Sequence, residues 1–329
     1  MSLDRVGYKI DSTIKDAYRA SFQTVDNEIY YLMLICTKVL YCNKGHRKIT
    51  VDIDRLYDEF VYFRYYSKMS DDYLLNFFMP LMVVSRSFEN YEEEALSLIE
   101  KLCKFYNLPN KKYDYTMDLL CYDIVFRKLL LSDTAMIEIL YEIKDKLIEF
   151  NPYKLNKKEN IKFQIRKIKY IENIHKCIDH YEIEKKESFF ESEIKLIDIL
   201  QCAYDVEDVD KSLENMDCGS ISVYNFIKKV SESKGSDSLE IKNEKFIDAM
   251  GDYLIKIRNI EVNTKKYNAS SNPKSFLNMN IGDEFVDPIL NQAKILYKDI
   301  EKEDGEDKYI IEVSTKTGNY KFRYPKNKK

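Results

Sequence analysis

The apolar residues of this chain recur with the period of an α-helix up to about residue 262. Residues 91–106 show the pattern most clearly, because acidic residues that favour the positive end of a helix precede one continuous apolar face. The same period predicts helices over residues 29–40, 53–65, 156–181, 188–203, 220–233 and 243–260. Ser70 is predicted to cap a further helix, with Asp71 and Asp72 in its first turn.

The helix predicted over residues 156–181 is amphipathic, and its isoleucines form one apolar stripe. The stripe consists of Ile161, Ile165, Ile168, Ile171, Ile174 and Ile178. Basic side chains share a second face of this helix, namely Lys158, Lys162, Arg166 and Lys169.

Beyond residue 262 the period of the pattern changes from 3.6 to 2, which is typical of strands. Alternation over residues 309–315 and 320–324, with Thr317 and Gly318 between them, predicts a tight hairpin. A third strand is predicted around residues 293–297, and an acidic loop over residues 301–307 separates it from the hairpin.

These patterns divide the chain into an all-helical domain over residues 1–262, a linker over residues 263–280 and a small β-module with a basic tail over residues 281–329. Only 8 of the 329 residues are glycine, and none lies between Gly45 and Gly219. Rossmann, P-loop and TIM-barrel folds, which need glycine at turns and phosphate loops, are therefore excluded there. We predict a mainly α fold: a multi-helix orthogonal bundle followed by a small C-terminal antiparallel β-module.

The overall charge and hydropathy limit the kinds of partner that this protein is expected to bind. A formal charge of −4 excludes a protein that coats nucleic acid along its whole length. The longest uncharged stretch, residues 73–85, is shorter than the roughly 18–20 apolar residues of a membrane span, so no membrane association is expected. The first residues contain no apolar signal region, and the 7 cysteines lack a Cys-x-x-Cys pair. We expect free thiols and a cytoplasmic protein.

A first candidate for chemistry precedes the helix predicted over residues 29–40. Thr24, Asp26 and Asn27 carry oxygen atoms of the kind that bind Mg²⁺. The alternative is an ordinary helix cap, since Thr24 is a good capping residue and acidic side chains favour a helix start.

The order of segments resembles the ADP-ribosylglycohydrolases, an all-α family in which a Thr-Asp-Asp-Thr motif opens such a helix and a later Asp-x-Asp-Thr motif completes a dinuclear magnesium site. Thr24 and Asp26 match the first motif, whereas Val25 replaces an acid and Asn27 replaces a hydroxyl residue. The later motif is represented by Asp217, Gly219 and Ser220, without acids at the family's spacing.

The resemblance implies Asp26 and Asp217 as catalytic residues and Thr24, Asp26, Asn27 and Ser220 as metal ligands. It implies magnesium as cofactor and an ADP-ribosylated substrate as partner. Because several acids are missing, it also implies a degenerate site with weak or lost hydrolysis of ADP-ribosyl bonds.

A different function is suggested by the basic helix. Residues 154–186 contain ten Lys or Arg and five acids, with Tyr153, Phe163, Tyr170 and Tyr181 interleaved. Cations on phosphates and rings stacked on bases would suit nucleic acid. The alternative, which the charge balance favours, is that this helix pairs with the acidic residues 205–217 inside the fold. The nearby histidines, His175 and His180, with Cys177 between them, are better explained as incidental than as a zinc site.

The C-terminal module is similar to SH3- or Tudor-like small barrels, which open on a Gly-Asp step, here Gly282-Asp283, and close on an aromatic, basic strand. Lys321 and Arg323 belong to that last strand. The alternative function is thus a non-enzymatic scaffold that binds nucleic acid or a partner protein through residues 154–186 and this module. A capping appendage whose basic tail aids solubility would explain the same residues.

Overall fold

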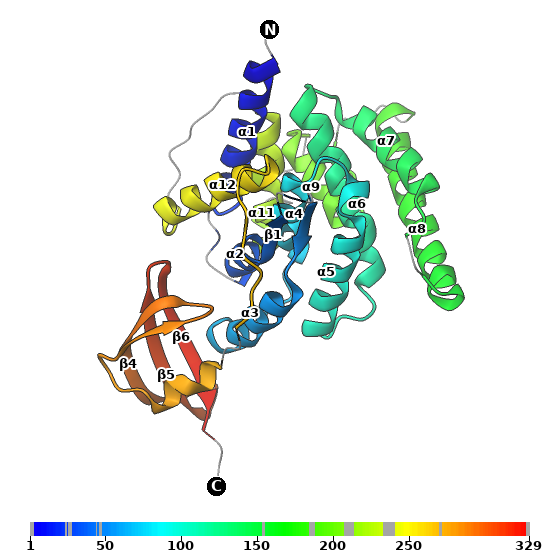
Figure 1. Ribbon diagram of the computed structural model, residues 1–329. Coiled ribbons are helices and arrows are strands. Elements are labelled where there is room, and N and C mark those ends of the chain that lie inside the picture. The colour runs from blue at the N-terminus through cyan, green and yellow to red at the C-terminus, as the bar shows by residue number, and fades with distance from the viewer. Residues whose placement is uncertain are drawn as a thin grey trace.

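A computed structural model of the protein describes residues 3–23, 25, 28–43, 45, 48–152, 155–183, 188–206, 214–232, 241–269 and 272–326. This part of the chain is mainly helical and ends in a four-stranded antiparallel sheet, which confirms the fold class at that level (Figure 1). No helix within these ranges is both long and apolar enough to cross a membrane.

The α-helices are α1 (Leu3–Ala20), α2 (Glu28–Val39), α3 (Ile53–Tyr66), α4 (Met79–Val84), α5 (Glu92–Phe105), α6 (Lys112–Leu131), α7 (Met136–Glu149), α8 (Lys157–Glu182), α9 (Lys195–Ala203), α11 (Cys218–Ser231) and α12 (Glu244–Arg258). Short 3₁₀ turns occur at η1 (Leu74–Phe78), η2 (Phe88–Asn90) and η3 (Pro273–Asn278).

Polar side chains fix the starts of several helices where the sequence predicts them. Asn156 and Glu159 form a capping box at the start of α8, in which the Glu159 N–H donates to Asn156 Oδ1 at 3.0 Å. Asp52 caps α3 by accepting from the Arg55 N–H at 3.2 Å. The boundaries predicted for α3 and α8 are therefore confirmed to within about two residues.

Three local predictions are wrong. Ser70 does not cap a helix, because its N–H and hydroxyl both donate to Glu28, and the chain enters η1 only at Leu74. α9 begins at Lys195 instead of residue 188, since the Ser192 hydroxyl is held by Asn173 of α8 at 2.9 Å. In a part of the chain predicted to hold only helices and short polar joints, β1 (Leu40–Asn43) pairs antiparallel with β2 (Lys48–Val51).

The first half of the isoleucine stripe of α8 does not face the core. Ile161, Ile165 and Ile168 are 55%, 54% and 54% exposed. The helix instead buries Phe163 and Tyr170, whose rings remove more apolar surface from water than isoleucine does. The side chain of Lys167 is also turned inward. Its ammonium donates to two carbonyl oxygens at the C-terminal end of α7, those of Ile148 and Phe150, at 3.2 and 2.9 Å.

The C-terminal sheet is a meander in which β3 (Glu284–Asp287), β4 (Asn291–Glu303), β5 (Glu306–Thr315) and β6 (Gly318–Pro325) are neighbours in chain order. The predicted hairpin is confirmed, with Thr315 opposite Gly318, whose φ of 122° favours glycine. The predicted acidic loop is shorter than expected, because Glu303 already pairs with Glu306.

The sheet lies beside α3 at the lower part of Figure 1, and aromatic side chains join the two. The Tyr66 ring lies 4.9 Å from Tyr320 and 5.6 Å from Phe322, both edge-on. The Tyr62 hydroxyl donates to Asp287 at 2.5 Å. The inward side chains of β6 are thus the surface that attaches the β-module to the helical part.

The described residues of the predicted linker, 263–269 and 272–280, make specific contacts with the rest of the protein. The Thr264 N–H donates to the Cys42 carbonyl on β1 at 3.1 Å, and the Tyr267 N–H donates to Asp52 at 2.8 Å. Further along, η3 packs against the sheet, where the Pro273 carbonyl accepts from the Tyr324 hydroxyl at 2.7 Å.

Gly219, in the first turn of α11, allows two backbone segments to approach closely. A Cβ atom at this position would lie 1.9 Å from the Tyr73 carbonyl oxygen. Such a contact is far inside van der Waals distance, so the absence of a side chain is required where α11 meets the segment before η1.

We predict that Gly219→Ala lowers the free energy of unfolding by about 2–4 kcal/mol, because the methyl group meets rigid backbone. Gly251→Ala is the matched control. Its Cβ would lie 3.2 Å from the flexible end of Lys15, and alanine has the higher helix propensity within α12. Urea unfolding followed by circular dichroism measures both, and equal stabilities of the two variants would contradict the close approach.

Candidate functional site

Three of the residues proposed as ligands, Thr24, Asp26 and Asn27, lie outside the described residues. The structure does place Glu28, the first residue of α2, which is buried. Its carboxylate accepts from the Ser70 N–H at 2.8 Å and from the Tyr106 hydroxyl at 2.6 Å. Burial raises the pKa of Glu28 in spite of these hydrogen bonds.

Asp217 and Ser220 form the N-terminal cap of α11. One oxygen of Asp217 accepts from the backbone N–H groups of Ser220 and Tyr73, at 2.8 and 3.1 Å. The other accepts from the Lys195 ammonium at 2.6 Å. Burial would raise the pKa of Asp217, but Lys195 and the two N–H groups outweigh it and lower the pKa.

These contacts do not fit a magnesium site at Asp217. Both carboxylate oxygens are already used, and the positive charge beside them is the ammonium group of Lys195. No group of three or more His, Cys, Asp or Glu side chains suited to a metal occurs among the described residues. The carboxylate predicted to be catalytic is therefore a capping and ion-pairing residue in this structure.

Residues 70–73 connect the starts of α2 and α11. Ser70 is bonded to Glu28 at the start of α2, and Tyr73 is bonded to Asp217 at the start of α11. Glu28 and Asp217, at the starts of the two helices that the resemblance concerns, are therefore joined through one short segment. We call residues 70–73 the tether.

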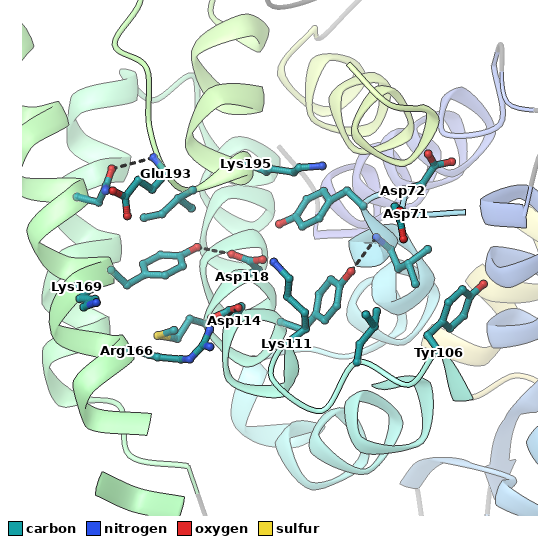
Figure 2. A pocket seen from close by; sticks show the side chains of 18 of the residues that line it. Asp71, Asp72, Tyr106, Lys111, Asp114, Asp118, Arg166, Lys169, Glu193 and Lys195 are labelled. Atoms are coloured by element: carbon teal, nitrogen blue, oxygen red, sulfur yellow. Dashed lines mark hydrogen bonds and ion pairs between the residues drawn. The ribbon is translucent and has the colours of Figure 1, made fainter. Parts of the chain in front are cut away.

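The tether lines a cavity of about 980 Å³. The opposite side is formed by α6 and α8, and the segment before α9 contributes Glu193 and Ile194 (Figure 2). This volume lies in the range of small-molecule sites, at about 300–1,000 Å³. Figure 2 shows Arg166 and Lys169 on one side of the cavity and Asp71 and Asp72 on the other.

Asp118 of α6 is the most deeply placed acid of this cavity, only 7% exposed. Its Oδ1 accepts from the Tyr170 hydroxyl of α8 at 2.5 Å. Burial raises the pKa of Asp118 to about 6, and Asp114 adds to the rise, while Tyr170, Tyr73 and Lys111 oppose it. A carboxyl group that titrates near neutral pH is able to accept or donate a proton to a bound molecule.

The Tyr73 hydroxyl is a buried polar group of the cavity wall without a hydrogen-bond partner among the described residues. It lies close enough to Asp118 for each to shift the pKa of the other, and burial raises the pKa of Tyr73 well above its usual value. The contact falls short of full hydrogen-bond geometry. A ligand atom at this position would complete the hydrogen bonding of a buried hydroxyl.

The basic residues around the cavity fall into two groups. Arg166 forms an ion pair with Asp114, at 2.6 Å for one oxygen, and Lys195 is paired with Asp217. Lys111 and Lys169 are exposed and form no ion pair with any described residue. These two ammonium groups are the cations that remain available for an anionic ligand.

The other predicted contact residues lie away from this cavity. Lys158 and Lys162 are exposed on α8 but do not line it. On the β-module, Lys321 pairs with Glu301 and Arg323 pairs with Glu303, each at 3.0 Å. The structure thus brings Arg166 and Lys169 together at the cavity, whereas Lys321 and Arg323 lie apart from them on the β-module.

Two further expectations fail for the described residues. Asp205 and Asp217, from the acidic stretch expected to neutralise the basic helix, pair with Lys228 of α11 and with Lys195. Of the four aromatic residues expected to stack on bases, Phe163 and Tyr170 are buried and Tyr181 is half-buried, with its hydroxyl bonded to Gln201. Tyr153 lies outside the described residues.

The cysteine and histidine interpretations fit the structure. All seven cysteines are free thiols, as predicted. Burial raises the pKa of Cys177 to about 12, while His175 faces Asp179 at 3.5 Å and His180 contacts the Ser188 carbonyl at 2.7 Å. These three side chains do not share a site.

No family model, curated protein or solved structure matches this chain. The geometry of the cavity therefore carries the functional argument.

The ionisation of Asp118 makes a prediction about stability. Because its pKa is higher in the folded protein than in the unfolded chain, Asp118 binds its proton more tightly when folded, and its contribution to stability decreases as pH rises through about 4–6. Asp118→Asn keeps a hydrogen-bond acceptor for Tyr170 but does not ionise. We expect its free energy of unfolding, relative to that of wild type, to rise by up to about 3 kcal/mol from pH 4 to pH 7.5. Urea unfolding at both pH values measures this difference, and a difference that does not change with pH would contradict the raised pKa.

Proposed function

We propose that this chain is an ADP-ribosylglycohydrolase-like helical protein that binds an ADP-ribosyl ligand in the cavity, with a degenerate magnesium site and weak or lost hydrolysis. The observation that carries the proposal is the tether, since it links the starts of α2 and α11 and also forms a wall of the cavity. A cytoplasmic location and an orthogonal arrangement of the helices belong to the same proposal.

The cavity suits the chemistry of such a ligand. A pyrophosphate group is anionic, and Lys111 and Lys169 offer two ammonium groups that form no ion pair with a described residue. The free hydroxyl of Tyr73 is able to donate to a phosphate or ribose oxygen. The rings of Tyr106 and Tyr115 give the same cavity apolar surface.

Weak or lost hydrolysis follows from the surroundings of Asp217. The family's mechanism needs carboxylates that hold metal ions, whereas this carboxylate accepts from Lys195 and from two backbone N–H groups. An ammonium beside an aspartate compensates its charge but does not activate a water molecule as a metal does. We therefore assign binding, and not turnover, as the function of the site.

Binding of ADP-ribose, measured by isothermal titration calorimetry, tests the proposal. We expect Lys169→Ala and Lys111→Ala each to weaken binding about tenfold or more, because each removes a charge-assisted contact to phosphate. Lys162→Ala is the matched control, since this lysine lies on the same helix outside the cavity. Equal loss in Lys162→Ala and Lys169→Ala would place the ligand elsewhere.

The degenerate metal site makes a separate prediction. Adding Mg²⁺ is expected to leave the affinity for ADP-ribose unchanged, and release of ADP-ribose from a modified protein is expected to be the same for wild type and Asp26→Ala. Chromatographic detection of released ADP-ribose measures turnover. Release that depends on Mg²⁺ and is lost in Asp26→Ala would restore the hydrolase interpretation.

The scaffold hypothesis with nucleic acid as partner receives less support. The cations of the β-module, Lys321 and Arg323, are paired with glutamates, and the rings of Phe163 and Tyr170 are buried. The affinity of a nucleic-acid site comes mainly from cations that are free to neutralise phosphates.

A further inference from the structure

An exposed face of α8 carries an apolar stripe whose middle residue, Ile165, also lines the cavity. Ile161, Ile165 and Ile168 follow the i, i+4, i+7 spacing of one helix face and are each more than half exposed. In Figure 1 this helix lies at the edge of the molecule, and its opposite face packs on α6 and α7. Single exposed isoleucines are ordinary, but three in one row form a patch that marks an interaction surface.

Lysines run beside this stripe. Lys158, Lys162, Lys169 and Lys176 are separated by four, seven and seven residues, so they lie in a row along one flank of the isoleucines. All four are exposed, and none forms an ion pair with a described residue. Lys169 also lines the cavity, so Lys158, Lys162 and Lys176 are the lysines of this row that lie outside it. The surface therefore combines an apolar centre with a positively charged border.

We propose that this face of α8 binds an acidic amphipathic helix of a partner protein. The apolar face of such a helix would cover Ile161, Ile165 and Ile168, and its acidic residues would meet the row of lysines. This charge complementarity selects the occupant. A second copy of the same face would bring lysines towards lysines.

A protein helix fits this surface better than nucleic acid does. The row of isoleucines offers no ring for a base to stack on, and the rings of Phe163 and Tyr170 face the core. Removing isoleucine side chains from water is favourable only against another apolar surface. The lysines alone would not distinguish the two partners, but the isoleucines do.

The test uses a fluorescently labelled helical peptide with leucines along one face and glutamates on the others, and measures its binding to the full chain by fluorescence anisotropy. Saturable binding by wild type is expected. The double variant Ile161→Ser/Ile168→Ser is expected to bind at least tenfold more weakly, because two apolar contacts are lost. Ile300→Ser, an exposed isoleucine of the β-module at 42%, is the matched control and is expected to bind like wild type.

A charge exchange tests the lysine border. Lys158→Glu/Lys162→Glu is expected to lose binding of the glutamate peptide and to gain binding of a peptide in which lysines replace the glutamates. Circular dichroism of each variant confirms that α8 still folds.

Three results would overturn the proposal. The first is no saturable binding of the glutamate peptide by wild type, or equal binding by the isoleucine double variant. The second is self-association of wild type in sedimentation experiments that the isoleucine variants abolish, which would make a second copy the occupant. The third is tight binding of a single-stranded oligonucleotide that the lysine variants abolish and the isoleucine variants leave unchanged.

Discussion

The arrangement of this protein depends on the tether, residues 70–73. Its first residue is held by the buried carboxylate of Glu28, and its last by the carboxylate that caps α11. Contact between the tether and α11 is close enough to require glycine at position 219. Because buried carboxylates and backbone N–H groups must be satisfied together, the starts of two helices about 190 residues apart are fixed relative to one wall of the cavity.

This constraint determines what the cavity offers chemically. Asp217 is used to hold the tether and is neutralised by Lys195, so the acid nearest the family's motif takes no part in lining the cavity. The available groups are instead the carboxyl of Asp118, the unpaired hydroxyl of Tyr73 and the two free lysines. Under the proposed function, such a set would recognise an anion and exchange a proton with it, which needs no metal ligand at Asp217.

The sequence predicts much of the fold and little of the site. Asn156 and Glu159 mark the start of α8 in the sequence, and the alternation on both sides of Thr317 predicts the hairpin of β5 and β6. Both features are predictable because their signals are local. The burial of Asp118 depends on Tyr170, 52 residues away, and no local pattern reports that contact. The only sequence signal for this burial was Asp118 itself, an acid flanked by apolar residues of α6. The periodicity of α8 was likewise compatible with two apolar faces, and the larger rings decided which one is buried.

The most direct test of the account is amide hydrogen exchange of the full chain with and without ADP-ribose, followed by mass spectrometry. The account predicts slower exchange on ligand addition in peptides covering the tether, the start of α6 and the middle of α8, with no change in the β-module. Unchanged exchange in the tether, with protection confined to residues 281–326, would contradict it.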